Sequence, residues 1–459
     1  MPQGRLGPRV IIAGTSSGVG KTTVTTAILS ALHHAGLRVS PAKVGPDFID
    51  PTYHELACGL RGRTLDTFLL GTEAIVPALF DLSRSAEITV IEGVMGLFDG
   101  TLMKRDGTGD NLGIDPKLTG GSTAEVAALT RTPVILILDA TATSSSLAAV
   151  VEGFCNFSAQ VKIAGVVINN YGKASHLELI KSSLKHLDIE IIGAIPRGSV
   201  PPWRSRHLGL IPAIEDPDGL RESIAFLEDR IGPLLDVSKI IEIAKSAPAM
   251  LVDYHTGEAI SSPRTTIAVA GGPAFSFMYP ENVRAFEAAG AQLAFFDPLK
   301  DASLPPGSKG LYVGGGFPEV FADKLSLNQP LIQEVKKAIS DGLPTWAECG
   351  GLMWLSKRVD SAQMVGAIST HVTMGKHLTL GYARVSAICD NCLTKKDEVI
   401  YGHEFHYSQS FPAGTDLEYS TREGTKKEGF ATPSLFASYL HIHLGSQQHL
   451  AERFVSKCS

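Results

Sequence analysis

Short runs of apolar, often β-branched residues alternate with longer amphipathic stretches from Arg9 to about Arg197. Apolar runs separated by helical patterns predict buried strands joined by helices, and therefore a mostly parallel sheet. The runs that we expect to form strands are residues 10–13, 89–91, 134–138, 163–168 and 190–194. The first part of the chain is thus predicted to be an α/β unit.

The same pattern starts again from Thr265. We expect strands at residues 266–270, 292–296 and 310–313, then a helix over 330–340 and a strand that ends near Ala347. Between the two units, a weakly periodic helix at 236–244 is followed by a polar stretch. We therefore predict an N-terminal α/β domain over 1–240, a linker over 241–264 and a second α/β domain over 265–459.

Length and composition restrict the class of protein. A chain of 459 residues, 44% hydrophobic and 19% charged, suits two or three folded domains. The net charge of −6 gives no overall basic field, so we expect no nucleic-acid partner. The apolar runs are shorter than the roughly 20 residues of a membrane span. With no signal-like N-terminal stretch and six dispersed cysteines, we expect a soluble, cytoplasmic protein without membrane contact.

A glycine-rich segment, Gly14-Thr-Ser-Ser-Gly-Val-Gly-Lys21-Thr-Thr23, follows the first predicted strand and precedes a helical pattern. Its glycines let backbone N–H groups surround a polyphosphate at the helix N-terminus, Lys21 adds positive charge, and the Thr22 hydroxyl can reach Mg²⁺. The spacing is one residue longer than the strict motif, a departure that resembles dethiobiotin synthetase and its relatives. The predicted nucleotide contacts are Thr15, Ser16, Ser17, Gly18, Val19, Gly20, Lys21, Thr22 and Thr23.

Two acidic segments follow at or just after the ends of predicted strands. The first contains Asp47 and Asp50, and the second contains Glu92 and Asp99. Ligands bind at the carboxyl ends of parallel strands, and a magnesium nucleotide needs hard oxygen ligands there. We therefore predict Glu92 and then Asp47 as metal ligands beside Thr22. Capping of turns is the alternative for Asp50 and Asp99, because Asp-Pro and Asp-Gly are ordinary turn pairs.

In the second domain, Cys349 stands between an apolar strand and a helix and is followed by two glycines. A tight strand-to-helix turn exposes the thiol, and we expect the helix N-terminus to lower its pKa and to offer N–H groups to an oxyanion. His441, after an apolar run, is the predicted base. The glycines of the segment 314–319 can supply further oxyanion donors. The remaining cysteines lack such a setting.

Several segments between Arg9 and His443 together resemble the cobyrinic acid a,c-diamide synthase family, including its hydrogenobyrinic acid variant. The resemblance implies a dethiobiotin synthetase-like P-loop domain followed by a class I glutamine amidotransferase domain. Apart from the glycine-rich loop, the segments that carry it are residues 43–54, 91–100, 121–126, 206–210, 347–352 and 402–406.

The resemblance implies that ATP, Mg²⁺ and L-glutamine are used to amidate the a and c acetate side chains of a corrin-type macrocycle through acyl phosphates, in cobalamin biosynthesis. It assigns Cys349 as the glutaminase nucleophile and His441 as its base. Ordinary class I glutaminases carry Glu two residues after this histidine, but His443 stands there, so we expect a Cys-His dyad. By analogy with dethiobiotin synthetase, Asn169 contacts the nucleotide base.

Lys43 is expected to neutralise the substrate carboxylate or the γ-phosphate. A polycarboxylate substrate also requires clustered cations on this acidic chain, preferably arginines. Arg61 with Arg63, and the segment 203–207, are such clusters, although solvated surface arginines are the alternative. The predicted substrate-binding residues are Asp47, Asp50, Asp99, Arg206 and His207.

Alternatives remain open on the sequence alone. An amidase of sirohydrochlorin-type rings is close to the preferred function, whereas cobyric acid synthase is disfavoured by the Asp47–Pro51 and Glu404–His406 segments. A P-loop switch ATPase without glutaminase activity is a rival of another class. The segment 402–407 either lines the glutamine or ammonia site or is an ordinary half-buried strand. The metal of the macrocycle and assembly as a homodimer are also open.

Overall fold

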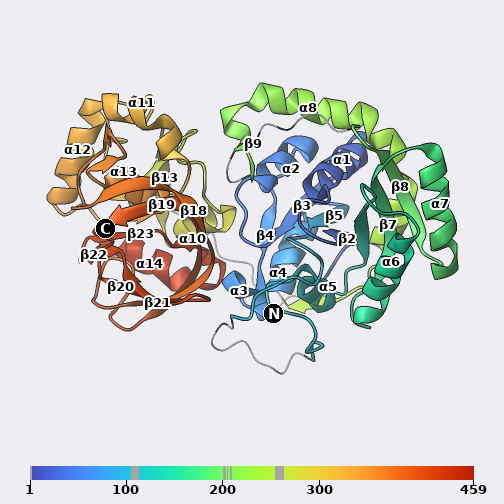
Figure 1. Cartoon of the computed structure of the whole chain (residues 1–459). Coiled ribbons are helices and arrows are strands. Elements are labelled where there is room, and N and C mark those ends of the chain that lie inside the picture. Colours follow the sequence, from blue (N-terminus) through green and yellow to red (C-terminus); the bar gives the residue numbers. More distant parts are fainter. Residues whose placement is uncertain are drawn as a thin grey trace. The chain divides into compact units, whose positions relative to one another are not determined.

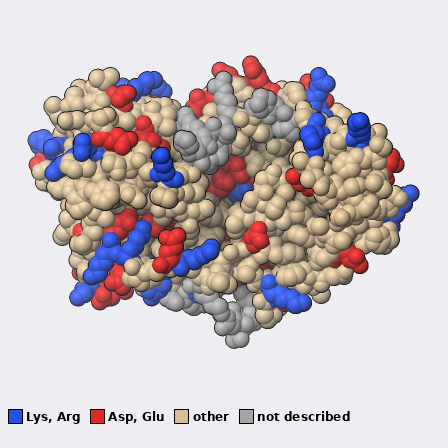
Figure 2. Space-filling view, viewed as in Figure 1, with Lys and Arg blue, Asp and Glu red and all other residues tan. Residues whose placement is uncertain are grey.

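The computed structural model describes residues 3–103, 105, 113–199, 203, 205–206, 209–253 and 263–459. The chain forms two compact units, residues 1–255 and 256–459 (Figure 1). On the face that Figure 2 shows, acidic and basic side chains are interspersed, as expected for a small net charge. None of the described helices is both long and apolar enough to cross a membrane.

The first unit is built on a seven-stranded, all-parallel sheet with the order β4-β3-β5-β2-β6-β7-β8. The strands are β2 (Arg9–Gly14), β3 (Val39–Val44), β4 (Arg63–Leu65), β5 (Ile88–Glu92), β6 (Val134–Asp139), β7 (Ile163–Tyr171) and β8 (Glu190–Pro196). Helices cover both faces, so alternate residues of β2 are buried on opposite sides. This explains why the strands read as continuous apolar runs, and it confirms the predicted α/β class.

Two groups of helices cover this sheet. Helices α4 (Thr72–Ser83), α5 (Thr123–Thr130), α6 (Ser146–Phe157) and α7 (Ala174–Leu184) contribute to one apolar core, whereas α1 (Lys21–His34) packs with α2 (Asp50–Cys58), α8 (Pro217–Arg230) and α9 (Val237–Lys245). The short α3 (Thr67–Leu70) precedes α4. The residues between β2 and α1 and those after β3 and β5 therefore lie at the carboxyl edge of the sheet, where ligands bind in such folds.

The first unit extends beyond the predicted boundary at residue 240. The apolar side of α9, with Ile240 and Ala244 fully buried, packs against β2. The strand β11 (Leu251–Asp253) then pairs antiparallel with β1 (Gln3–Arg5). Residues 241–253 are therefore part of the folded unit and not a linker, and residues 254–262 of the predicted linker lie outside the described residues.

The second unit contains a six-stranded sheet with the order β13-β12-β14-β15-β23-β22, parallel except for the last pair. Its strands are β12 (Thr265–Ala270), β13 (Ala291–Phe296), β14 (Gly310–Val313), β15 (Thr345–Glu348), β22 (Phe430–Thr432) and β23 (Leu435–Ser438). Its helices are α10 (Pro280–Ala288), α11 (Ala322–Leu327), α12 (Gln329–Ser340), α13 (Gly350–Leu355) and α14 (Gln448–Lys457). On one face, Phe286, Tyr312, Trp346 and Phe454 form an aromatic cluster.

A second, largely antiparallel sheet completes this unit. Its centre is the long pair β18 (His371–Ala387) and β19 (Val399–Phe411), and the short β24 (His441–Ile442) joins β19. The other strands are β16 (Arg358–Val359), β17 (Ala362–Gln363), β20 (Leu417–Thr421) and β21 (Gly424–Glu428). This sheet brings β19 alongside the predicted base His441.

We expect Arg9 to be a major stabilising residue of the first unit. Its guanidinium donates to the carbonyl oxygens of Gly7, Thr130 and Pro248, and its side chain is almost fully buried. Arg9→Met would leave these carbonyls without the donor and should lower the free energy of unfolding by about 3 kcal/mol. The exposed Arg38→Met is the matched control and should change it by less than about 0.5 kcal/mol. Denaturant unfolding measures both, and equal effects would contradict the assignment.

Candidate active sites

The glycine-rich loop between β2 and α1 has the geometry of an anion-binding loop. Gly18 and Gly20 have φ values of 79° and 96°, which favour glycine. Among the described residues, no backbone N–H from Ser16 to Gly20 donates to a backbone carbonyl. These donors at the N-terminus of α1 are therefore available to a nucleotide polyphosphate. The Lys21 ammonium folds back and donates to the Ser16 carbonyl at 3.0 Å.

A buried cluster of charged side chains adjoins this loop. The Lys43 Nζ donates to Asp50 Oδ2 at 2.8 Å and to Glu92 Oε1 at 2.9 Å. The Thr22 hydroxyl donates to the same oxygens, at 3.1 Å to Asp50 and 2.8 Å to Glu92. The other Glu92 oxygen is 2.6 Å from His54 Nε2. Residues from α1, β3, α2 and β5 thus converge on one carboxylate, Glu92.

The pKa shifts follow from these contacts. Burial alone would lower the pKa of Lys43, but the Asp50 and Glu92 carboxylates outweigh it and raise that pKa. Burial would raise the pKa of Glu92, but Lys43 and His54 outweigh it and lower that pKa. Burial, and next the Asp47 carboxylate, raise the pKa of Asp50 well above its usual range. Lys43 and Glu92 therefore form a charged pair inside the protein.

The cluster offers hard oxygen donors of the kind that Mg²⁺ takes. The Thr22 hydroxyl and one carboxylate oxygen each of Asp50 and Glu92 lie together, joined at present by hydrogen bonds of 3.1 and 2.8 Å. No group of three or more His, Cys, Asp or Glu side chains in the described ranges could hold a metal ion. A bound ion would thus take part of its ligands from the Thr22 hydroxyl and from nucleotide oxygens.

The two remaining acidic candidates differ from Asp50. One oxygen of Asp47 accepts the N–H groups of Ile49 and Asp50, and the other is 3.8 Å from Lys43 Nζ. Asp99 accepts the N–H of Gly96 at 2.8 Å, which is the turn-capping arrangement. The structure therefore brings Asp50, more directly than Asp47 or Asp99, to the oxygens of Thr22 and Glu92.

Asn169 braces the glycine-rich loop. It is buried at the end of β7, its Nδ2 donates to the Val19 carbonyl at 2.9 Å, and its Oδ1 accepts the N–H of Asn170. A Cβ atom at Gly20 would lie 2.5 Å from Asn169 Nδ2, so only glycine fits there without a shift. These contacts give Asn169 a supporting role that the sequence did not indicate.

The predicted cationic clusters are only partly described. Arg206 lies on the strand β9 (Ser205–Arg206), which pairs with β10 (Gly209–Leu210), but its side chain and His207 lie outside the described residues. Arg63 forms an ion pair with Asp81 at 2.9 Å. The Trp203 indole donates to the Thr23 hydroxyl at 2.9 Å and packs edge-on against the Tyr53 ring. The Trp203 side chain therefore packs beside the start of α1.

In the second unit, Cys349 occupies the predicted strand-to-helix turn between β15 and α13. Its φ of 47° is rare for a residue with a side chain, and such strain is typical of a nucleophile presented on a tight turn. The Cys349 N–H donates to the Ser438 carbonyl at 2.7 Å. A Cβ atom at Gly351 would collide with the Val313 carbonyl, so the turn requires glycine there.

The expectation that the helix N-terminus lowers the pKa of Cys349 is wrong. Burial, and next the carboxylate of Glu319, raise the pKa of this thiol, and the Gly350 N–H offsets only part of the effect. The helix α13 has only six residues, and the thiol is nearly inaccessible to water. The side chain is therefore a neutral thiol near neutral pH and needs a base.

His441 is neutral near neutral pH, as a group that is to accept a proton must be. Burial, and next His406, lower its pKa to about 3, which keeps the ring unprotonated but makes it a weaker base than an ordinary imidazole. A Cβ atom at Gly315 would overlap the His441 ring, and one at Gly350 would lie 3.0 Å from the Gly316 N. The loop after β14 thus contacts both the turn at Cys349 and the His441 imidazole, and oxyanion donors must lie near both groups.

Glu348 is a buried residue of this site that the sequence did not indicate. It accepts the hydroxyl of Tyr312 at 3.1 Å and the N–H of Ile442 at 3.3 Å. Burial raises its pKa to about 8. Because Glu348 precedes Cys349 and Ile442 follows His441, this bond ties the nucleophile turn to the strand that carries the base.

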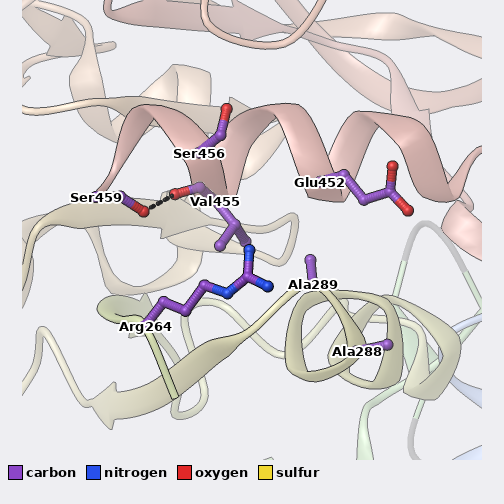
Figure 3. Close-up of a pocket in the computed structure, with 7 residues that line it drawn as sticks. All are labelled: Arg264, Ala288, Ala289, Glu452, Val455, Ser456 and Ser459. Carbon is purple, nitrogen blue, oxygen red and sulfur yellow. Dashed lines mark hydrogen bonds between the residues drawn. The ribbon is translucent and has the colours of Figure 1, made fainter. Parts of the chain in front are cut away.

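A surface pocket of about 600 Å³ lies elsewhere in the second unit (Figure 3). Arg264, residues of α10 and α14, and the residues just after these helices line it, including Glu452 and Ser459. The Ser459 hydroxyl donates to the Val455 carbonyl. None of the candidate catalytic residues takes part, so we do not assign the pocket to the reaction.

The chain matches known proteins over nearly all of its length. The family model of the CobQ/CobB/MinD/ParA nucleotide-binding domain matches residues 10–210, and that of the CobB/CobQ-like glutamine amidotransferase domain matches residues 266–449. Hydrogenobyrinate a,c-diamide synthase of Streptomyces coelicolor is 37% identical, over 98% of this chain and 97% of that protein. Cobyrinate a,c-diamide synthases of Synechococcus sp. and Priestia megaterium are 39% and 37% identical, each over 98% of this chain and over 98% and 97% of their own lengths.

Among solved structures, MinD of Pyrococcus horikoshii with Mg-ADP covers 52% of this chain and 94% of its own, with 15% identity and a TM-score of 0.30. PurLQS of Thermotoga maritima covers 43% of this chain and 97% of its own, with 14% identity and a TM-score of 0.30.

A P-loop domain joined to a glutamine amidotransferase domain defines a glutamine-hydrolysing carbon–nitrogen ligase that is driven by a nucleotide. The identities and coverage go further: the chain belongs to the cobyrinate and hydrogenobyrinate a,c-diamide synthase family.

Gly315→Ala should abolish glutamine hydrolysis while the second unit stays folded, because the added methyl overlaps the His441 ring and displaces it. Gly271→Ala is the control in the same unit, because a Cβ atom there would make only ordinary contacts at 3.8 Å. Glutamate release measures the effect, and circular dichroism checks the fold. A Gly315→Ala protein with wild-type hydrolysis would show that the ring and this loop are not in contact.

Proposed function

We propose that this protein uses ATP and L-glutamine to amidate the a and c acetate carboxylates of cobyrinate or hydrogenobyrinate through acyl phosphates, in the cytoplasm. The observation that carries the proposal is the presence of both half-sites in one chain: the Thr22–Asp50–Glu92 cluster beside the anion-binding loop, and Cys349 with His441. Relatives that align over 98% of the chain are named hydrogenobyrinate and cobyrinate a,c-diamide synthases, which supports this choice of substrate.

In the synthetase unit, loop N–H groups and Lys21 bind the nucleotide phosphates. Thr22, Asp50 and Glu92 would hold Mg²⁺, with Asp47 as a further candidate, and the ion would supply charge neutralisation during phosphoryl transfer. Thr15, Ser16, Ser17, Gly18, Val19, Gly20 and Thr23 complete the loop, and Asn169 braces it. In this proposal the macrocycle carboxylate attacks the γ-phosphorus, ADP leaves, and ammonia later displaces phosphate from the acyl group.

Lys43 links the metal site to the substrate in this proposal. Its ammonium contacts Asp50 and Glu92 and is almost fully buried. The Lys43 ammonium would also interact with a further anion that binds at the carboxyl edge of the sheet. This anion is either the macrocycle carboxylate or the γ-phosphate. Asp47, Asp99, Arg206 and His207 are the further candidates for contacts to the macrocycle.

In the glutaminase unit, the Cys349 sulfur attacks the glutamine amide carbon and His441 takes the thiol proton. Because burial keeps both groups neutral, this transfer accompanies attack and does not precede it. N–H groups of Gly316 and Gly350 support the oxyanion. His441 then protonates the departing ammonia, and water hydrolyses the thioester to glutamate.

The main test is a coupled ATPase assay with glutamine against cobyrinate, hydrogenobyrinate and sirohydrochlorins, with mass spectrometry to count the amides. Activity on sirohydrochlorins alone would favour the alternative tetrapyrrole amidase. The match to a glutamine amidotransferase domain argues against a P-loop switch without glutaminase activity. Sedimentation would test the proposed homodimer.

Cys349→Ala should abolish glutamine-dependent amidation and leave amidation from added ammonium salts nearly intact, because only the ammonia source is lost. His441→Ala should behave in the same way, and His443→Ala should be milder. Product formation from each nitrogen source measures the effects. If Cys349→Ala lost both activities at unchanged stability, the cysteine would serve the synthetase reaction instead.

Lys21→Ala and Glu92→Gln should each reduce amidation from either nitrogen source by more than about 100-fold, because both act on the magnesium nucleotide. Lys239→Ala, at an exposed ion pair with Glu190, is the control for loss of a lysine in the same unit. Initial rates at varied Mg²⁺ measure the effect. Wild-type magnesium dependence in Glu92→Gln would remove the metal assignment.

A further inference from the structure

A second imidazole lies against the predicted base. His403 on β19 is the direct antiparallel partner of His441 on β24. Their rings are stacked, with centroids 4.9 Å apart and planes 15° apart, and both side chains are almost fully buried. Gly402 permits this approach, because a Cβ atom there would collide with the His441 carbonyl. The two strands thus press one imidazole face onto the other.

Tyr279 holds the second ring in place. Its hydroxyl is 2.8 Å from His403 Nε2. Tyr279 directly precedes α10, and its own ring lies 4.6 Å from that of His443. The orientation of His403 is therefore fixed by a hydrogen bond from another element and not by its strand alone.

The carboxylate of ordinary class I glutaminases has no equivalent at its usual position, two residues after the base. His443 stands there, and its ring accepts the N–H of Gly445 at 3.1 Å. The other ring nitrogen lies 3.4 Å from Glu281 Oε2. His443 therefore faces Glu281 and Tyr279, and the ring in stacking contact with the base is His403.

The charge state of His403 suits this position. Burial, and next the neighbouring His441 and His443, lower its pKa well below the usual range, so the ring is neutral. A neutral aromatic face attracts a cation placed over it. His441 becomes such a cation when it accepts the proton of Cys349, and again when it accepts a proton from the hydrolytic water. His406 also lowers the pKa of His441, whereas Glu404 raises it.

We propose that His403 is a positioning residue of the glutaminase: its stacked ring fixes the plane of His441 and stabilises the imidazolium formed during catalysis. The proposal rests on the glutaminase role of Cys349 and His441. In acylation, the S–H bond of Cys349 breaks as sulfur bonds to the amide carbon, His441 takes the proton, and it returns the proton to the departing ammonia as the C–N bond breaks. In hydrolysis, His441 takes a proton from the attacking water and returns it to the Cys349 sulfur as the C–S bond breaks. His403 itself gains and loses no proton.

Two variants separate stacking from hydrogen bonding. His403→Phe keeps an aromatic face but cannot bond Tyr279, whereas His403→Gln keeps a polar partner for Tyr279 without a ring. We expect kcat for glutamine hydrolysis to fall about 10-fold or more in His403→Gln and less than about 3-fold in His403→Phe, with the KM for glutamine nearly unchanged in both. His449→Gln, at an exposed histidine of α14, is the matched control.

Circular dichroism and thermal unfolding report whether the second unit of each variant is folded, and amidation from ammonium salts, which the first unit carries out, should remain at the wild-type rate. Equal or greater activity of His403→Gln than of His403→Phe would overturn the proposal, as would a change confined to the KM for glutamine. If Cys349→Ala retained glutamine hydrolysis, the proposed glutaminase itself would fail, which distinguishes the two failures.

Discussion

The contact between Lys43 and Glu92 organises the first unit around its site. Both side chains are removed from water, which costs several kcal/mol for each ion unless every charge is matched and hydrogen-bonded. Here Glu92 has Lys43, Thr22 and His54 around its two oxygens, and Lys43 has Asp50 as a further partner. The loss of one partner would leave another buried charge without compensation, so α1, α2, β3 and β5 are held in register by electrostatics as well as by packing.

In the second unit, the cost of burying charged groups is avoided in a different way. Burial shifts the pKa of Cys349 upward and that of His441 downward, so both groups lose their charges. The neutral pair has no standing thiolate, which protects the cysteine from oxidation and from adventitious electrophiles between turnovers. In the proposed reaction, the synthetase unit thus retains charge at its site, while the glutaminase unit generates charge only when Cys349 attacks glutamine.

The sequence was sufficient where a local pattern determines the structure. The strands at 10–13 and 134–138, the glycine-rich loop and the turn at Cys349 were predicted because strand runs and glycines act over a few residues. Contacts between distant residues were not predictable: His54 meets Glu92 across 38 positions, and Tyr279 meets His403 across 124. The pKa of Cys349 was predicted with the wrong sign because burial depends on the whole fold. The domain boundary was placed too early because the helix at 237–245 has an apolar side whose partner, β2, lies far away in the chain.

The position of Trp203 has an optical consequence. The chain has three tryptophans, and Trp346 and Trp354 are fully buried in the second unit. Trp203 is the one in the first unit, is partly exposed, and bonds through its indole N–H to Thr23 in the first turn of α1. Indole emission depends on the polarity and hydrogen bonding around the ring. Emission at longer wavelengths, from Trp203, is therefore expected to change when the glycine-rich loop changes. Emission at shorter wavelengths, from Trp346 and Trp354, is expected to report the packing of the second unit.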